Sequence, residues 1–491
     1  MGEVDDRRGE GVTMNGTVYL LGAGVNQSLK DFDNLSPPIM TNFFRTTLRK
    51  RKYSDEHYVN KIKVVYDYIE KYWKKTKTDL ANAPFDLEQC FTLLERQKEE
   101  AYEKNKEEYR WLLTIQFRLK SFLAEVLSEF EYSGFNLSMY NFGRILFHER
   151  PTIITFNYDC ILESIIESAS RVNPTIPKQF RDWKPFEELE IPDELLVYSH
   201  YNWNRPLGYG ITFDEVQLQQ AGVGKYVDGK RFYSHPQNKL YSCPILKLHG
   251  SLNWFRYLPV RSFPTLPCEE KPTLGDKEHE IVLVRGHWWF NEPPTHHGWY
   301  IDPIIITPVL YKNRFFRESP FKQIWEMARN VLSKCRRLVV IGYSFSPSDF
   351  STRQLLLEAF STNDLEELVI VNPNVRIVQI VKDLCHFNGG AIWYRSLEEY
   401  VRAFSKTKLG ADILIKEEAI KVPLEGIPTD TTPHDLYVKC KTCSVEFPAG
   451  IRTNPRSFAT SVYVGSMHQC PKGHMHSYDK GDYILKKAVK Q

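Results

Sequence analysis

Small and polar residues follow the first two apolar, strand-like runs of this chain, and their types suit contact with a phosphate and a sugar. The run 17–21 ends in the glycine loop Gly22–Asn26, and the run 153–156 ends in Asn157 and Asp159. A loop of small residues lets backbone N–H groups approach a phosphate closely, as in dinucleotide sites. An asparagine amide can orient a water or a ribose hydroxyl without introducing a charge.

Two later apolar runs end in a comparable way. The run 245–248 ends in His249, and the run 338–341 ends in Gly342–Ser344. A histidine can take a proton from a water or from a ribose hydroxyl near neutral pH. In open parallel sheets, ligands bind outside the carboxyl ends of the strands, so the four loops would share one crevice. The pattern therefore predicts an enzyme that acts on a dinucleotide.

Each of these residues also has a purely structural interpretation. Asn157 and Asp159 could form a turn, because both side-chain types bond their own backbone there. His249 could be a buried structural histidine, and Ser344 could belong to the N-cap region of the next helix. Their joint placement at the ends of separate strands favours a shared site.

The motifs resemble the sirtuin superfamily, and more closely the prokaryotic SIR2-like proteins. The resemblance extends over roughly residues 15–405 and includes a ribose-contacting asparagine, which falls on Asn372. It implies that Asn157 and His249 are the catalytic residues, and that Asp159 holds the nicotinamide carboxamide. The residues that it implies for binding NAD are Gly22, Ala23, Gly24, Val25, Asn26, Phe156, Asp159, Gly342, Ser344 and Asn372.

Two departures from the sirtuin deacylases bear on the expected reaction. The deacylases usually have an Asp-Phe-Arg segment after the glycine loop, whereas 31–33 reads Asp-Phe-Asp. They also insert a four-cysteine zinc module after the catalytic histidine, and here that interval contains only Cys268 and Cys335. Prokaryotic SIR2-like proteins with these simplifications resemble NAD glycohydrolases that deplete NAD during phage infection.

The resemblance thus implies that NAD is hydrolysed to nicotinamide and ADP-ribose, as an effector of anti-phage defence. Two alternatives remain open at this point. One is an NAD-dependent protein deacylase or ADP-ribosyltransferase, and the other is a sensor that binds NAD or ADP-ribose without turnover. Unregulated NAD loss would harm the host, so we expect a homo-oligomer or a protein partner to act as the trigger.

A second cluster of chemically suited residues lies near the C-terminus. Two ligands three positions apart suit a tight turn, and a second pair from a facing turn completes a tetrahedron around zinc. Gly473 would allow the unusual backbone of such a turn, and the β-prone run 461–464 suggests a small zinc ribbon. The predicted Zn²⁺ ligands are Cys440, Cys443, Cys470 and His474, with His468 and His476 as alternatives for the fourth position.

The elements that must position these residues alternate between strands and helices. We predict an α/β fold, a Rossmann-like doubly wound parallel sheet with a helical insertion, followed by a zinc-ribbon-like module. Helices are predicted near 107–130, 320–334, 350–360 and 375–386, and further strands at 337–341 and 367–371. The predicted organisation is a catalytic domain 1–405, a linker 406–433 and a module 434–491, with insertions at about 40–148 (helical) and 171–243 (irregular), and a second irregular stretch at 256–303.

Composition restricts the class of partner. The 491 residues carry a net charge of only +3, which gives no warrant for strong binding to nucleic acid or to an anionic membrane. No apolar run approaches the roughly 18 residues of a membrane span, and the charged segment 1–11 is not a signal peptide. The odd count of nine cysteines fits a reducing cytoplasm, which is the expected location.

Overall fold

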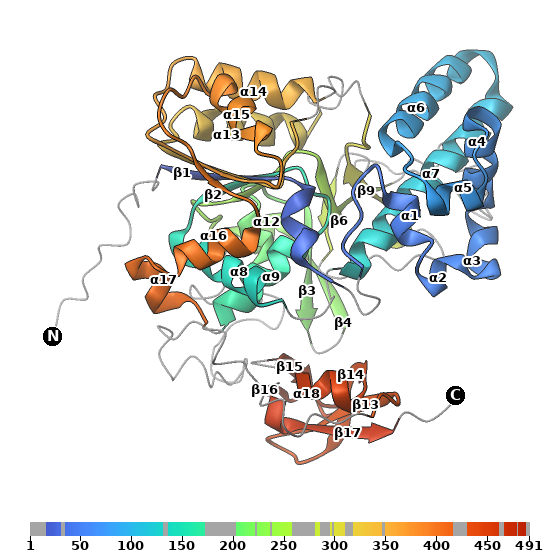
Figure 1. Ribbon diagram of the computed structural model, residues 1–491. Helices are drawn as coiled ribbons and strands as arrows, with labels where there is room; N and C mark the ends of the chain where they lie inside the picture. The colour runs from blue at the N-terminus through green and yellow to red at the C-terminus, as the bar shows by residue number, and fades with distance from the viewer. Residues whose placement is uncertain are drawn as a thin grey trace.

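A parallel sheet of six strands places the predicted site loops (Figure 1). Its order is β12-β11-β10-β1-β2-β5, and every neighbouring pair is parallel. Counted along the chain, this is the 3-2-1-4-5-6 order of doubly wound dinucleotide folds, with its switch point between β1 and β10. The predicted fold class is confirmed. The strands are β1 (Thr17–Leu21), β2 (Thr152–Thr155), β5 (Ile245–Lys247), β10 (Arg337–Ile341), β11 (Glu367–Val371) and β12 (Ile392–Tyr394).

The computed structural model describes residues 16–30, 35–130, 136–171, 203–220, 223–235, 238–257, 280–284, 295–296, 299–309, 318–345, 349–415, 430–460, 466–478 and 480–487. The central strands are continuous apolar runs because helices cover both faces of the sheet. Figure 1 shows α13 (Phe321–Leu332), α14 (Phe350–Phe360) and α15 (Arg376–Leu384) over one face. On the other face lie α8 (Leu137–Glu149), α9 (Ile161–Arg171) and α16 (Leu397–Phe404).

Most of the segment between β1 and β2 is helical, as the sequence predicts. The side chains of Asp86 and Asn105 cap α6 and α7 by accepting backbone N–H groups of the first turn. Edge-to-face contacts of Phe43 with Phe44 and Phe122 join the helices in one core. In chain order, the 3-10 helix η1 (Ala23–Ser28) comes first. The α-helices that follow it before α8 are α1 (Phe43–Thr47), α2 (Arg51–Ser54), α3 (Glu56–Lys61), α4 (Lys63–Trp73), α5 (Lys77–Asn82), α6 (Leu87–Lys104) and α7 (Lys106–Glu129).

A second six-stranded sheet, of mixed direction, has the order β4-β3-β7-β6-β9-β8. Most of its strands lie in two stretches, 171–243 and 256–303, that the sequence predicts to be irregular, whereas β6 lies largely between them. In β9 the strand pattern is interrupted by Pro303, which lies opposite Phe255. The elements are β3 (Glu215–Gln220), β4 (Val223–Asp228), β6 (Gly250–Tyr257), β7 (Ile281–Leu283), β8 (Thr295–His296) and β9 (Trp299–Ile305), with the short helices α11 (Arg205–Gly208) and α12 (Gly229–Ser234).

The start of the predicted linker packs against the domain that contains the parallel sheet. Helix α17 (Lys408–Ile413) is followed by Ile415, whose N–H and C=O both bond the side chain of Asn141 on α8 at 2.9 Å. The guanidinium of Arg144, also on α8, donates to the carbonyl oxygen of Ile413. The chain therefore stays attached to the domain through residue 415.

The C-terminal module has its own small core, built around Leu436, Val438, Phe447 and Tyr478. Its three-stranded sheet has the order β14-β13-β17, and β15 and β16 form a separate hairpin. The predicted run 461–464 lies outside the described residues. The elements are β13 (His434–Lys439), β14 (Glu446–Thr453), α18 (Pro455–Thr460), β15 (Ser466–Gln469), β16 (Met475–Tyr478), the 3-10 turn η7 (Lys480–Asp482) and β17 (Tyr483–Lys487). Across the described parts of the chain, no helix has both the length and the apolarity needed to cross a bilayer.

Candidate functional site

The glycine loop after β1 packs directly against the loop after β10, at the switch point of the sheet. The N–H groups of Gly22 and Gly24 donate to the carbonyl oxygens of Ile341 and Gly342, both at 2.9 Å. A Cβ on Gly24 would lie 2.7 Å from the carbonyl oxygen of Gly342. Gly342 itself has a φ of +64°, which favours glycine. These glycines therefore permit close packing of the two loops, and a phosphate bound here must use other donors than these two amides.

Replacing Gly24 by alanine is expected to lower the unfolding temperature, because the added methyl would force the two loops apart. Overpacking of this kind costs about 1–3 kcal/mol. Gly390→Ala is the matched control, because a Cβ at that position meets nothing within 4 Å. Thermal unfolding of the two variants in parallel checks the prediction, and equal unfolding temperatures would contradict the packing argument.

Asn157 and His249 lie at equivalent positions beyond the carboxyl ends of two neighbouring strands. β2 and β5 pair in parallel with Thr155 opposite Lys247. The N–H of Leu248 donates to the carbonyl oxygen of Thr155 at 2.9 Å, which continues this register past the strand ends. Two residues beyond the last pair, the chain reaches Asn157 on one side and His249 on the other. The register therefore brings the amide and the imidazole to the same edge of the sheet.

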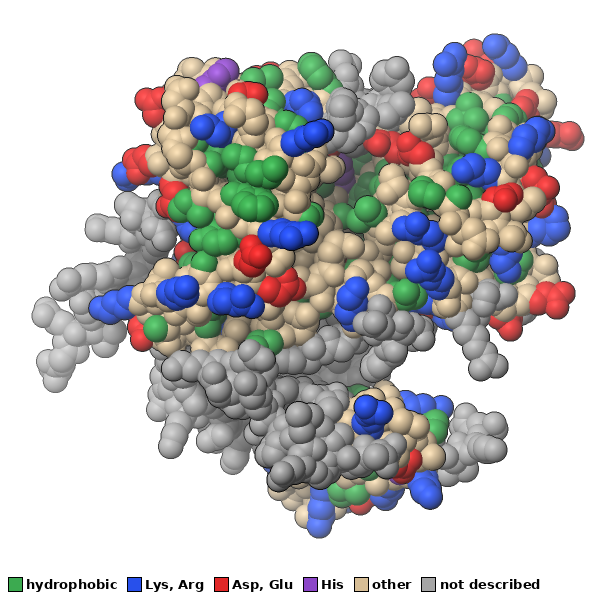
Figure 2. All heavy atoms as spheres, in the orientation of Figure 1, with side chains coloured by type: hydrophobic (Ala, Val, Ile, Leu, Met, Phe, Trp, Pro, Cys, Tyr) green, Lys and Arg blue, Asp and Glu red, His purple; other side chains and the backbone are tan. Residues whose placement is uncertain are grey.

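The imidazole of His249 lies between the two aromatic residues that flank Asn157. Its ring centroid is 5.2 Å from that of Phe156 and 6.2 Å from that of Tyr158. Phe156 in turn stacks on Tyr343, at 4.4 Å between ring centroids. The aromatic rings leave His249 only 6% exposed, whereas Asn157 is half-buried. In Figure 2 the surface is hollowed between the helices α13–α15 and the helical insertion.

Asp159 and Asn26 join the glycine loop to the turn that follows β2. The amide of Asn26 donates to Asp159 Oδ2 at 3.0 Å, and both side chains are buried. Asn157 makes a second link, since its Nδ2 donates to the carbonyl oxygen of Gly22 at 3.3 Å. Burial raises the pKa of Asp159 to about 6, although Lys247 acts to lower it. The carboxyl group therefore titrates just below neutral pH.

The remaining predicted residues surround the loop after β10. The buried amide of Asn372, which follows β11, donates to the carbonyl oxygen of Tyr343 at 3.0 Å. This hydrogen bond helps to fix the loop after β10. The Tyr343 hydroxyl donates to Asp349, and Phe345 between them has a φ of +51°, an uncommon conformation for a bulky residue. Ser344 is exposed. The loop is thus held at both ends and exposes its serine.

Two features of the site escaped prediction from the sequence. The first is Glu88 on α6: burial, followed by the charges of Glu88 and Asp349, raises the pKa of Tyr158, so the helical insertion brings an acidic group near the site. The second is a buried ion pair between Lys247 and Glu163, 2.8 Å apart. The sequence did contain a signal for this pair: Lys247 is a charged residue within an apolar strand, two residues before His249, and a buried lysine needs a partner.

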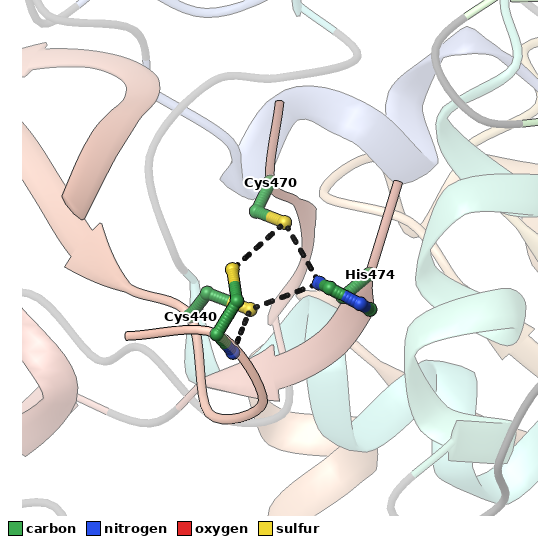
Figure 3. A group of neighbouring side chains, drawn as sticks. Cys440, Cys470 and His474 are labelled. Atoms are coloured by element: carbon green, nitrogen blue, oxygen red, sulfur yellow. Dashed lines mark hydrogen bonds between the residues drawn. The ribbon is translucent and has the colours of Figure 1, made fainter. Parts of the chain in front are cut away.

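Four side chains of the C-terminal module converge on one point, as Figure 3 shows for Cys440, Cys470 and His474. His474 Nδ1 lies 3.4 Å from Cys470 Sγ and 3.8 Å from Cys440 Sγ, and Cys443 Sγ lies 3.8 Å from Cys470 Sγ. Ligands about 2.3 Å from a tetrahedral ion are about 3.8 Å apart, so the spacing fits. These four residues can therefore hold a metal ion.

The backbone of the two turns is preorganised for this arrangement. Gly473 has a φ of +88°, so the turn between Cys470 and His474 contains the glycine-favouring backbone that its sequence predicts. Burial acts to raise the pKa of Cys440, but the backbone N–H groups of Cys443 and Thr442 outweigh it and lower this pKa to about 6. A thiol of this kind is readily deprotonated, as a metal ligand must be.

The two alternative histidines are engaged elsewhere. His476 Nε2 lies 2.8 Å from the hydroxyl of Thr442, and His468 Nε2 lies 2.7 Å from the hydroxyl of Tyr483. The group of potential metal ligands includes His474 and neither of the other two. Among the described residues, the group that could hold a metal ion is therefore completed by His474.

Comparisons with known proteins return matches among solved structures only, since no protein-family model and no curated protein matches the chain. A Sir2 homologue in complex with NAD is 11% identical, with a TM-score of 0.32, over 78% of this chain and 85% of that chain. A mutant Sir2 homologue with ADP ribose is 12% identical, with a TM-score of 0.30, over 80% and 94% of the two chains. A Sir2 mutant with a p53 peptide and NAD is 13% identical, with a TM-score of 0.27, over 79% and 92%.

Proposed function

We propose that this protein is an NAD glycohydrolase of the SIR2-like class, which cleaves NAD to nicotinamide and ADP-ribose. The observation that supports this most directly is that Asn157 and His249 lie beyond the carboxyl ends of neighbouring strands, in a sheet with the strand order of dinucleotide-binding folds. The switch point between β1 and β10 is where such folds bind a dinucleotide. A half-buried amide and an imidazole beside that point are suited to act on the nicotinamide ribose.

The proposed reaction passes through a state with positive charge on the ribose ring. The amide of Asn157 orients a water or a ribose hydroxyl, and the imidazole of His249 accepts a proton from it. Nicotinamide leaves as a neutral group, its carboxamide held by Asp159, and the oxygen of water forms the new bond to ribose. Since His249 is 6% exposed, the rings that cover it must shift before the imidazole reaches the sugar. The Phe156–Tyr343 stack is the natural element to move.

One assay distinguishes this activity from the alternatives. The purified chain is incubated with NAD, with and without an acylated lysine peptide, and the products are separated. Nicotinamide release without peptide is the expected result, whereas release only with peptide would assign a deacylase. Binding of NAD with no release under either condition would favour a sensor and contradict the proposal.

The pH dependence of turnover follows from Asp159. If this carboxylate accepts a hydrogen bond from the carboxamide, activity is full above its pKa of about 6 and falls as pH decreases through that value. Asp159→Asn is expected to remove the contribution of this carboxyl group to the acid limb and to raise KM for NAD by about tenfold or more, as expected for a lost hydrogen bond to a charged group. Measured profiles of kcat/KM against pH check both effects. Asp435→Asn, at an ion-paired residue of the module, should keep the acid limb.

We further propose Zn²⁺ as the ion of the Cys₃His cluster, because three thiolates and an imidazole in tetrahedral spacing are typical zinc ligands. The module lies outside the strands that hold the candidate active site, so we propose it as the part that contacts a partner or a second copy of the chain. In this proposal, depletion of NAD in the cytoplasm serves anti-phage defence once such a trigger is present.

A further inference from the structure

Lys247 and Glu163 form an ion pair that is almost completely removed from solvent. Their side chains are 1% and 0% exposed, and Lys247 Nζ lies 2.8 Å from Glu163 Oε1. Removing two charges from water is costly, and a hydrophobic pair of similar volume is often at least as stable. Stability alone therefore does not account for this pair, and its other contacts indicate what it does.

The ammonium of Lys247 has two further acceptors, and both lie in the turn that follows β2. Nζ is 2.5 Å from the carbonyl oxygen of Asp159 and 3.4 Å from that of Tyr158. An ammonium has three N–H donors, so Glu163 and these two carbonyls use all of them. The turn that presents Asn157 and Asp159 to the site is thus attached to β5 through a single buried cation.

The opposite end of the ion pair leads toward His249. The Tyr209 hydroxyl donates to Glu163 Oε1 at 2.9 Å, and Asn253 Nδ2 donates to the Tyr209 oxygen at 3.0 Å. The Ser251 hydroxyl then donates to Asn253 Oδ1 at 2.6 Å. Ser251 is two residues beyond His249 at the start of β6. One buried polar network therefore connects the turn after β2 with the strand that follows the histidine.

The charges of the pair act on the Asp159 carboxyl group in opposite directions. Burial raises the pKa of Asp159, Lys247 lowers it, Glu163 raises it again, and the amide of Asn26 favours the ionised form. Burial also acts to lower the pKa of Lys247, but Glu163, Cys160 and Asp159 together bring it above its ordinary value. Lys247 is therefore charged at neutral pH.

We propose that Lys247, held by Glu163, is a positioning residue of the site: it fixes the turn that carries Asn157 and Asp159 through their backbone and places a positive charge next to that turn. This inference rests on the proposed function, in which Asp159 accepts a hydrogen bond from the nicotinamide carboxamide. Lys247 acts only through that turn, since its three donors are engaged within the protein.

Two single substitutions test the proposal because they have opposite effects. Lys247→Met removes the cation, so the midpoint of the acid limb of kcat/KM is expected to move upward by about one pH unit or more. Glu163→Gln keeps an oxygen acceptor for Lys247 and Tyr209 but removes the negative charge, so the midpoint is expected to move downward. Calorimetric titration of NAD from pH 5 to 8 against the same substitutions in a His249→Ala background, where NAD survives, measures the same midpoint without turnover.

A matched control separates this effect from a loss of stability. Lys50 and Glu129, 2.9 Å apart, form a partly buried pair in the helical insertion, with side chains 8% and 27% exposed. Lys50→Met should lower the unfolding temperature and leave the midpoint of the acid limb unchanged. A merely structural role for Lys247 predicts the same behaviour for Lys247→Met.

The outcomes are distinguishable from those that test the proposed function. Folded variants whose midpoints equal that of the wild type overturn the inference. Should Lys247→Met fail to fold, Glu163→Gln decides: a downward shift supports the inference and an unchanged midpoint overturns it. Binding of NAD with the predicted shifts but no nicotinamide release would contradict hydrolysis and leave the positioning role supported. A wild-type chain that neither binds nor cleaves NAD overturns both.

Discussion

Replacing His249 by alanine is expected to lower the rate of nicotinamide release by about a thousandfold, the typical contribution of a general base. The reason is that the proton of the attacking water or ribose hydroxyl would lose its acceptor at the edge of the sheet. Asn157→Ala is expected to lower the rate by about a hundredfold or more, comparable to the loss of one preorganised hydrogen-bond donor. Steady-state assays with NAD at neutral pH measure both effects.

Two controls make this result specific to the site. Asn82→Ala removes an exposed amide of α5, and His476→Ala removes an imidazole of the C-terminal module. Both should retain wild-type rates, and all four variants should remain folded at the temperature of the assay. Full activity in either His249→Ala or Asn157→Ala would show that the assigned role is wrong.

Cys440→Ser is expected to abolish metal binding and to unfold the C-terminal module. Among its described residues, the module's own apolar core contains only seven buried members, so we expect it to depend on the metal for stability. Structural zinc contributes about 10–16 kcal/mol in comparable small sites, far more than such a core supplies. Metal analysis should fall from one zinc per chain to nearly none, and limited proteolysis should cut within residues 434–487, the described strands of the module.

Substitutions at other positions test whether this effect belongs to the four ligands. Cys385→Ser changes a buried free cysteine just after α15, outside the C-terminal module, and should keep the zinc. His476→Gln should also keep it, whereas His474→Gln should lose it. A native Cys440→Ser protein with unchanged zinc content, or a wild-type protein without metal, would refute the assignment.

The parallel sheet was predictable because its strands are short, apolar and separated by helices with a clear period. The runs 17–21, 337–341 and 367–371 coincide with β1, β10 and β11. Their order along the sheet then follows from doubly wound topology. The close approach of the three cysteines and His474 was predictable from their spacing, since two short spacings in a small module leave few arrangements.

The second sheet was not predictable, because its strands are formed by non-local pairing rather than by local pattern. β6 is buried along almost its whole length and shows no polar alternation, and Pro303 interrupts β9. The Lys247–Glu163 ion pair was not predictable for a similar reason, because Lys247 lies on β5 and Glu163 lies on α9, far away in the sequence. The glycine loop was located correctly, but two of its amides bond the loop after β10, a contact that only the folded chain reveals.

A crystal structure of the His249→Ala variant with NAD tests the central claim most directly, because the substrate would survive in the site. The nicotinamide ribose should lie within hydrogen-bond reach of the Asn157 amide and beside the space vacated by the imidazole, with the diphosphate at the β1–β10 switch point. NAD bound at another edge of the sheet, or a ribose remote from residue 157, would contradict the account.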